Sequence, residues 1–331
     1  MNIFVTGGAG YIGSATAEAL LKAGHTVTIY DSLVTGHRAA IPSGARFVEA
    51  PLEDRRSLAK TLTQQAFDAV MHFAAFIEAG ESMKDPGRVY FNNLGNSLTL
   101  IETAHLAGVS RFVFSSTAAV YQSSDAPLTE DSSLGPTNVY GHTKLMVEQT
   151  LDWYRQVHGL HFAALRYFNA CGALPGRGEA HQPESHLIPL VLRVALGQSD
   201  SASIFGTDYP TPDGTCIRDY IHIADLVDAH LLALNALTES DRLVYNVGSG
   251  HGFSVRQVID MARKVTGHPI PAVESPRRSG DSPRLVASSA KIRRELHWQP
   301  QHDSLEEIVS SAWEWQKTHP RGYKRKGIII S

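Results

Sequence analysis

The stretch Phe4-Val5-Thr6-Gly7-Gly8-Ala9-Gly10-Tyr11-Ile12-Gly13 decides the fold of this chain. It begins in a short apolar run, Asn2–Thr6, and leads into an alanine- and leucine-rich helical pattern, Ser14–Ala23. Glycines at such a strand–helix junction permit a tight turn and let backbone N–H groups approach a pyrophosphate. Asp31 ends the next strand pattern about 20 residues later, where a carboxylate would bond ribose hydroxyls and repel a 2′-phosphate. The sequence therefore predicts a dinucleotide-binding turn that takes NAD rather than NADP.

Strand and helix patterns alternate through the first half of the chain. This alternation predicts right-handed crossovers and a parallel sheet that is covered by helices on both faces. A ligand cleft is expected at the carboxyl ends of its strands. The expected strands are His25–Tyr30, Arg46–Glu49, Ala69–Phe73, Arg111–Ser115 and Phe162–Tyr167, and the expected helices are Arg55–Gln65, Asn93–Ala107 and Thr143–His158.

The second half changes character. Gly172–Glu184 is rich in Gly, Pro and charge and predicts a loop, and Pro269–Arg284 reads as irregular. Helices are expected at Leu187–Ala195, Ala224–Leu237, Ser254–Thr266 and Ser304–Lys317, and strands at Ser203–Gly206, Thr215–His222 and Leu243–Gly248. We expect an α/β chain with a Rossmann-type, doubly wound parallel sheet from residues 1–170 and about 215–249. A smaller C-terminal α/β cap would be formed by about 171–214 and 250–331.

Composition sets outer limits on function. The 331 residues carry a formal net charge of −3, which gives no reason to expect nucleic acid or an anionic membrane as partner. No run approaches the ~20 apolar residues that span a bilayer, and the N-terminus lacks signal-peptide features. Two cysteines, Cys171 and Cys216, predict buried free thiols and a cytoplasmic protein. The histidines form no metal-ligand spacing, so no metal site is predicted. The closing run Lys324–Ile330 is expected to be a frayed tail or an edge strand.

Tyr140 and Lys144 are the strongest catalytic candidates. They lie four residues apart in a helical pattern, so they share one face of the helix. A free tyrosine has a pKa near 10, and a neighbouring cation lowers that pKa so that the phenol can serve as a base at neutral pH. Together with the nucleotide turn, the pair predicts hydride chemistry on an alcohol.

Hydroxyl groups end the strand pattern Phe112–Thr117, where a doubly wound sheet faces its cofactor. Thr117, in preference to Ser116, could hydrogen-bond the reacting alcohol, although hydroxyls at strand ends commonly cap turns. Asn92 could orient this network or could cap the following helix.

The glycine turn, the strand-end Ser-Ser-Thr and the Tyr-x-x-x-Lys pair resemble the extended short-chain dehydrogenase/reductase family over nearly the whole chain. Within it, the chain looks most like the UDP-glucose (UDP-galactose) 4-epimerases. The segments that carry this closer likeness are His72-Phe73-Ala74-Ala75, Phe114–Tyr121, Leu165–Asn169, Ile204–Thr211, Asp213-Gly214-Thr215, Arg218–His222 and Pro276–Asp281.

The resemblance implies reversible, NAD-dependent epimerisation of UDP-galactose and UDP-glucose at C4. Tyr140 would take the proton of the sugar 4-hydroxyl, and Thr117 would bond the same oxygen. Lys144 would bind the nicotinamide ribose and, with the positive nicotinamide, lower the pKa of the tyrosine. Hydride would pass from C4 to NAD, giving a 4-keto sugar that turns over in the pocket and takes the hydride back on its other face.

The resemblance also implies the ligand contacts. The cap would bind the UDP-sugar, for which arginine suits the diphosphate. A homodimer would form through Asn93–Ala107 and Thr143–His158. The implied cofactor contacts are Gly7, Gly10, Tyr11, Ile12, Gly13, Asp31, Ser32, Leu52, Phe73, Ala74, Ala75, Asn92, Ser115, Tyr140, Lys144 and Tyr167. The implied substrate contacts are Thr117, Tyr140, Phe168, Asn169, His186, Leu187, Ser203, Phe205, Arg218, Arg278 and Asp281.

The chain departs from the family pattern around the cofactor. Pro51-Leu52 stands where an aspartate often contacts the adenine, and Ser32 replaces an asparagine. Ile77, followed by Glu78, replaces a lysine that contacts the cofactor. We therefore expect NAD to be held less tightly than in members that keep the lysine.

Other functions share part of this residue pattern. A sugar-nucleotide 4,6-dehydratase needs an acid/base pair directly after the threonine, where Ala118 and Ala119 cannot exchange protons. A 4-epimerase of UDP-pentoses, UDP-N-acetylglucosamine or UDP-uronates would use the same C4 chemistry and stays open. An ordinary alcohol dehydrogenase would not need the UDP contacts, and a non-catalytic NAD-sensing protein would not need both Tyr140 and Lys144.

Overall fold

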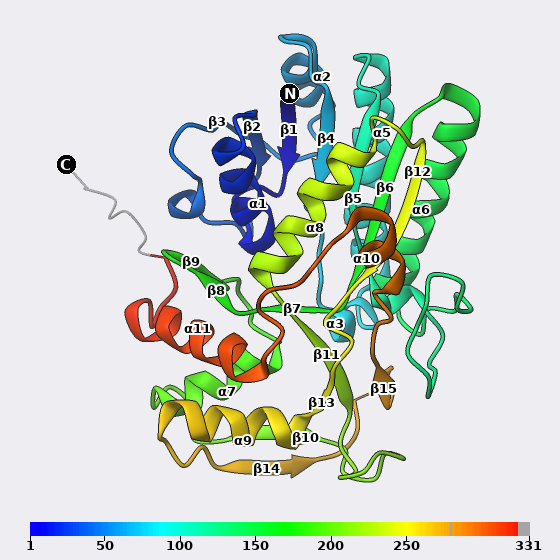
Figure 1. The fold of residues 1–331 in the computed structure, drawn as a ribbon. Coiled ribbons are helices and arrows are strands. Elements are labelled where there is room, and N and C mark those ends of the chain that lie inside the picture. Colours follow the sequence, from blue (N-terminus) through cyan, green and yellow to red (C-terminus); the bar gives the residue numbers. More distant parts are fainter. Residues whose placement is uncertain (279, 324–331) are drawn as a thin grey trace, which may run out of the picture.

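A seven-stranded parallel sheet forms the larger part of the molecule (Figure 1). The computed structural model describes residues 1–278 and 280–323. The sheet order is β12-β6-β5-β4-β1-β2-β3, and every pairing within it is parallel. The strands are β1 (Asn2–Thr6), β2 (Thr26–Asp31), β3 (Arg46–Glu49), β4 (Ala69–His72), β5 (Arg111–Thr117), β6 (His161–Tyr167) and β12 (Arg242–Val247).

Helices cover both faces of this sheet, because successive residues of its strands point to opposite sides. In β1, Ile3 and Val5 join one buried cluster and Phe4 joins the other. The first cluster is closed by α1 (Tyr11–Lys22) and α8 (Ile223–Ala236), and the second by α2 (Arg55–Thr63), α5 (Asn96–Leu106) and α6 (Val139–His158). The predicted doubly wound parallel sheet is confirmed.

A smaller cap lies below the large sheet in Figure 1. Its own apolar core is built from α7 (Leu187–Ala195), α9 (Val255–Thr266) and α11 (Leu305–Thr318), packed against β10 (Ala202–Phe205). Strand β14 (Ala272–Ser275) pairs with β10 in parallel. A further sheet joins β7 (Asn169–Cys171), β11 (Ile217–His222), β13 (Gly252–Ser254) and β15 (Arg284–Leu285), and β8 (Ala173–Leu174) pairs with β9 (Arg177–Gly178). The shorter helices are α3 (Ala79–Ser82), α4 (Pro86–Val89) and α10 (Ala290–Leu296), with single turns at Arg38–Ala40, Tyr90–Gly95 and Ala118–Val120.

The structure differs from the expected segments of the second half in four places. The expected loop Gly172–Glu184 contains the two short strands β8 and β9. The strand expected at Thr215–His222 pairs with β7, β13 and β15 and does not enter the seven-stranded sheet. The stretch Pro269–Arg284 is not irregular throughout, because it contains β14. Ile292 of α10 and the adjacent Trp298 are buried in a core of the large sheet, so residues 250–331 are not all cap.

Two further observations concern the ends of elements and of the chain. The helix expected from Thr143 begins at Val139, where the Asn138 side chain accepts a hydrogen bond from Gly141 N at 2.8 Å. Tyr140 therefore lies in the first turn of α6. The predicted tail Lys324–Ile330 lies outside the described residues. Within the part that is described, no helix is both long and apolar enough to cross a membrane.

Candidate active site

A cleft of about 1150 Å³ runs along the carboxyl ends of the sheet strands. All the residues expected to contact the cofactor line it, from the glycine turn after β1 to Tyr167 at the end of β6. This volume exceeds the roughly 300–1,000 Å³ of a usual small-molecule pocket. The cleft therefore has room for a dinucleotide and a second ligand.

The glycine turn leaves a space lined by backbone atoms, and a side chain at Gly7 or Gly13 would fill it. Gly7 has a φ of +70°, and a Cβ there would lie 2.6 Å from Ala74 N. A Cβ on Gly13 would lie 2.2 Å from Gly7 O. Gly10 begins α1 without a side-chain cap, so the helix N-terminus faces the cleft with its N–H groups and the positive end of its dipole. These features suit a pyrophosphate.

Asp31 ends β2 at the rim of the same cleft. Its carboxylate accepts hydrogen bonds from Ala9 N at 3.0 Å and from Leu33 N at 2.8 Å. Burial raises the pKa of Asp31, and these two N–H groups act in the opposite direction. The carboxylate therefore stiffens the turn and retains lone pairs for a further donor, such as a ribose hydroxyl.

Tyr140, Lys144 and Thr117 line the cleft together. The Lys144 ammonium lies 5.9 Å from the centre of the Tyr140 ring and donates to Ser115 O at 2.8 Å. Burial raises the pKa of Tyr140 to about 12, while the neighbouring Thr117 hydroxyl lowers it. Burial also lowers the pKa of Lys144 to about 7, against an opposing effect of Glu148. In the protein alone, desolvation thus outweighs the expected effect of the lysine on the tyrosine.

The structure separates the two candidate hydroxyls at the end of β5. Ser116 is fully buried and donates to Glu148, which forms a buried ion pair with Arg166 at 2.6 Å. Thr117 lines the cleft and accepts a hydrogen bond from Ala119 N at 3.1 Å. Ser116 therefore supports the interior, and Thr117 is the hydroxyl that a ligand can reach.

Asn92 does not cap a helix, and its side chain is hydrogen-bonded to a neighbouring residue. It lies within the π-helical turn Tyr90–Gly95, lines the cleft and donates to Asn93 Oδ1 at 2.9 Å. Asn93, which the sequence did not single out, holds Phe76 through both backbone groups, at 2.8 Å and 2.9 Å. It thereby fixes the loop after β4 that forms one wall of the cleft.

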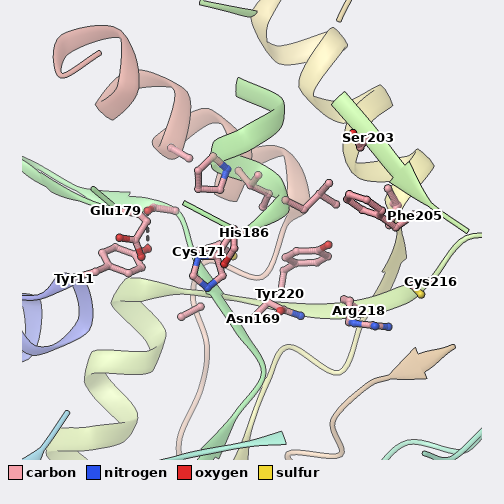
Figure 2. A pocket seen from close by; sticks show the side chains of 18 of the residues that line it. Tyr11, Asn169, Cys171, Glu179, His186, Ser203, Phe205, Cys216, Arg218 and Tyr220 are labelled. Atoms are coloured by element: carbon pink, nitrogen blue, oxygen red, sulfur yellow. Dashed lines mark hydrogen bonds between the residues drawn. The ribbon is translucent and has the colours of Figure 1, made fainter. Parts of the chain in front are cut away.

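A second pocket, of about 150 Å³, adjoins the cleft inside the cap (Figure 2). Leu187, Ser203 and Phe205 line this pocket, whereas Asn169, His186, Arg218, Arg278 and Asp281 line both pockets. Thr117, Tyr140 and Phe168 line the large cleft alone. The expected substrate contacts are therefore brought together around two connected spaces.

Two arginines converge on this pocket. Arg218 lies 3.4 Å and Arg278 lies 3.2 Å from the carboxylate of Asp281. The Arg278 guanidinium also stacks over Phe205, 4.6 Å from the ring centre. Asn169 donates to Asp219 O at 3.1 Å, which holds its amide at the junction of the two pockets. An aromatic ring beside paired guanidinium groups suits a nucleobase joined to a diphosphate.

The sequence did not single out Glu179, His181 and Glu184 in the loop between β7 and α7. His181 lies 2.9 Å from Glu179, and His186 lies 2.9 Å from Glu184. Burial alone would lower the pKa of His181, but Glu179, followed by Glu184 and Glu78, raises it to about 9. The pKa of His186 is also raised, since Glu184 and Glu179 outweigh its burial. In the sequence, the signal that could have identified this group is the presence of two histidines and two glutamates within eight residues of a Gly- and Pro-rich loop.

Comparison with known proteins agrees with this geometry. The sequence pattern of the NAD dependent epimerase/dehydratase family matches residues 3–248. The chain belongs to this family. Its cofactor is NAD, which the glycine turn and Asp31 fit.

Individual relatives of the family match over nearly the full length. A UDP-glucose 4-epimerase from Lacticaseibacillus casei is 46% identical over 327 residues, which is 98% of this chain and 99% of that protein. A crystal structure of a UDP-glucose 4-epimerase has a TM-score of 0.94 at 47% identity and covers 98% of this chain and 100% of its own. The UDP-glucose 4-epimerase of Bifidobacterium longum, in complex with NAD+ and UDP, has a TM-score of 0.94 at 34% identity and the same two coverages.

Proposed function

We propose that this protein is an NAD-dependent UDP-sugar 4-epimerase that interconverts UDP-galactose and UDP-glucose through a 4-keto sugar. One observation carries the proposal: a single cleft joins the Tyr140–Lys144–Thr117 cluster to the arginine pocket of the cap. The full-length relatives named UDP-glucose 4-epimerase support the same reaction.

Each residue of the cluster has a distinct task in this proposal. Tyr140 takes the proton from the sugar 4-hydroxyl as the C4 hydride leaves and returns a proton to that oxygen when the hydride comes back. Thr117 bonds the same oxygen and keeps it within reach of the phenol. NAD, when bound, accepts the C4 hydride and gives it back, so the reaction is redox-neutral over one cycle. Lys144, held by Ser115 O, binds the nicotinamide ribose.

The proposed base needs positive charge beside it. With the pKa of Tyr140 at about 12 in the protein alone, the phenol is a poor base at neutral pH. A cationic nicotinamide ring and the Lys144 ammonium both favour the phenolate, because an opposite charge within about 4–6 Å lowers the pKa of an acid. Because burial raises the pKa of Tyr140 in the protein alone, the strength of Tyr140 as a base depends on the bound cofactor.

The cap residues are proposed to hold the UDP moiety. Arg218 and Arg278 would exchange part of their contact with Asp281 for diphosphate oxygens. Phe205, Leu187 and Ser203 would line the uridine. Residues 1–170 would hold NAD together with α8 and β12, while β11 belongs to the sheet that carries the substrate residues.

A homodimer is proposed through the helices on one side of the sheet. Phe91, Leu98 and Leu106 are exposed on the helical segment 90–106, and Trp153 and Val157 are exposed on α6. Large exposed apolar side chains gathered on neighbouring helices are typical of an interface. Sedimentation should give twice the chain mass for the wild-type protein and a smaller species for Trp153→Glu, and a wild-type monomer would contradict the dimer.

A cytoplasmic location also remains part of the proposal. Cys171 and Cys216 are both buried and free, as expected of a protein from a reducing compartment.

The reaction is tested by incubating UDP-galactose with purified protein, with and without added NAD, and following UDP-glucose. Conversion without added NAD would support the reaction and show that the cofactor copurifies. Conversion only with added NAD would support the reaction together with the weak binding expected from Ile77. No conversion under either condition, with UDP-N-acetylglucosamine, UDP-arabinopyranose and UDP-uronates run in parallel, would remove the hexose assignment and identify the sugar that is turned over.

A further inference from the structure

The loop between β7 and α7 gathers metal-binding side chains where the two pockets meet. Glu179, His181 and His186 each offer one donor atom, and these atoms all lie within 4.8 Å of one another. Glu179 and His186 line both pockets, and His181 lines the large cleft. In Figure 2, Glu179 lies next to Tyr11 in the pocket wall that also carries His186.

His181 is the least satisfied member of this group. Its side chain is 11% exposed, yet neither ring nitrogen makes a hydrogen bond within the described residues. The 2.9 Å contact between Nδ1 and Glu179 is therefore an ion contact without hydrogen-bond alignment. A buried polar group without a hydrogen bond costs stability, so the site gains from anything that engages these nitrogens.

His186 is already oriented in the way that metal-binding histidines usually are. Its Nδ1 contacts the Glu184 carboxylate at 2.9 Å, which leaves Nε2 as the free donor atom. A carboxylate on the second ring nitrogen fixes the ring and raises the basicity of the first. The Glu184 side chain is only 1% exposed, so this contact is held inside the protein.

The loop backbone is anchored to three separate parts of the molecule. Tyr11 donates to Gly172 O at 2.7 Å, and Trp315 Nε1 donates to Glu179 O at 3.0 Å. His37 Nε2 contacts Ala180 O at 2.9 Å. Because these contacts come from α1, α11 and the segment after β2, the donor atoms are held on a supported loop.

We propose that Glu179, His181 and His186 form a binding site for one divalent transition-metal ion, best matched by Zn²⁺. Two imidazoles and a carboxylate form a ligand set that zinc accepts, whereas Ca²⁺ and Mg²⁺ prefer oxygen ligands. With metal–ligand bonds of about 2.0–2.1 Å, tetrahedral ligands lie roughly 3.3 Å apart, so the three side chains need only small rotations. Three protein ligands leave a fourth position, which would take water or an oxygen of a bound ligand, since all three residues line the cleft.

The distribution of charge supports a cation at this position. Glu179 lies 2.9 Å and Glu184 lies 3.8 Å from ring nitrogens of His181, and Glu184 also lies 2.9 Å from His186. Two carboxylates thus lie beside two imidazoles, and a divalent ion that displaces the imidazole protons is balanced by their charge. The sequence shows no metal signal, because one residue separates Glu179 from His181 and four residues separate His181 from His186, a spacing that matches no common metal motif.

The test uses the full chain, stripped with a chelator, dialysed and titrated with Zn²⁺ alone. We expect one Zn²⁺ per chain by calorimetry and by elemental analysis, and visible Co²⁺ absorption typical of four-coordinate binding. His181→Gln and Glu179→Gln each remove a ligand and should weaken binding at least about tenfold. Glu184→Gln removes the carboxylate that supports His186 and lies 3.8 Å from His181 Nε2, and it should weaken binding by about 10–100-fold.

The matched control is His251→Gln. His251 is an exposed histidine that lies 3.9 Å from a carboxylate in the cap, so its loss reports on binding by surface histidines. This variant should keep the wild-type stoichiometry and affinity. Circular dichroism would establish that all variants are folded.

Two results would overturn the proposal: no stoichiometric Zn²⁺ on the wild-type chain, or wild-type binding by both His181→Gln and Glu179→Gln. In either case the cluster would be an ion-pair network that only braces the loop. The readout is metal binding itself, so the outcome is independent of whether the chain epimerises UDP-galactose.

Discussion

Replacing Tyr140 by phenylalanine tests the proposed chemistry at one atom. The substitution keeps the aromatic ring, its place in the first turn of α6 and the Lys144 contact at 5.9 Å from the ring centre. Only the hydroxyl is lost, along with its interaction with the Thr117 hydroxyl. Because a positioned acid/base group contributes about 10²–10⁴-fold, epimerisation should fall by that factor. This corresponds to about 3–5 kcal/mol of transition-state stabilisation.

The pH dependence gives a second readout of the same group. With the pKa of Tyr140 at about 12 in the protein alone, roughly one phenol in 10⁴ is ionised at pH 8. Each unit by which bound cofactor lowers this pKa increases the ionised fraction about tenfold. The wild-type rate should therefore rise with pH on the acid side of this pKa, and the residual rate of Tyr140→Phe should not.

The assay follows UDP-galactose conversion at saturating NAD, with bound NAD measured in parallel. Tyr90→Phe is the matched control, since its hydroxyl bonds His142 Nδ1 at 2.7 Å and its side chain does not line the cleft. This control should retain the wild-type rate. If Tyr140→Phe keeps both full NAD binding and the wild-type rate, the assignment of the base is refuted.

Three further perturbations follow from the structure. Gly13→Ala places a methyl group 2.2 Å from Gly7 O and should abolish NAD binding, measured as nucleotide released from denatured protein; normal occupancy would contradict binding of NAD at the glycine turn. Burial lowers the pKa of His72 to about 3, so the unfolded chain binds more protons between pH 6.5 and 3. The free energy of unfolding should fall by about 2 kcal/mol between pH 6.5 and 4.5, and urea titrations of His72→Asn should show a smaller fall. Ile77→Lys restores a cation beside the cleft and should slow NAD release in stopped-flow experiments; an unchanged rate would exclude a cofactor contact at this position.

The parallel sheet could be predicted from sequence because its signals are local. Arg46–Glu49 and Leu187–Ala195 were predicted residue for residue, since an apolar pattern and its flanking breakers mark both ends. The start of α6 was placed four residues late. Its first turn contains Tyr140 and Gly141, which give no apolar periodicity, and the stabilising signal is the cap at Asn138.

Strand β14 could not be predicted from the local sequence pattern, because it depends on pairing with a distant strand. Its partner β10 lies 70 residues earlier, with Ala202 opposite Ala272. Prolines and arginines surround the strand, and its central residues Val273 and Glu274 are both exposed. No alternating pattern therefore marks it, and only the pairing with β10 makes it a strand.

The expected cofactor and substrate regions are also joined by contacts that no local sequence signal marks. Tyr11 belongs to the glycine turn, yet its hydroxyl bonds Gly172 O in the loop that carries His186. Arg177 of the same loop reaches back to Glu18 of α1 at 2.6 Å. The two sites thus share a wall whose contacts join residues about 160 positions apart. A division by sequence position cannot separate them, because the loop that lines the cap pocket is itself held by α1, whose N-terminus faces the large cleft.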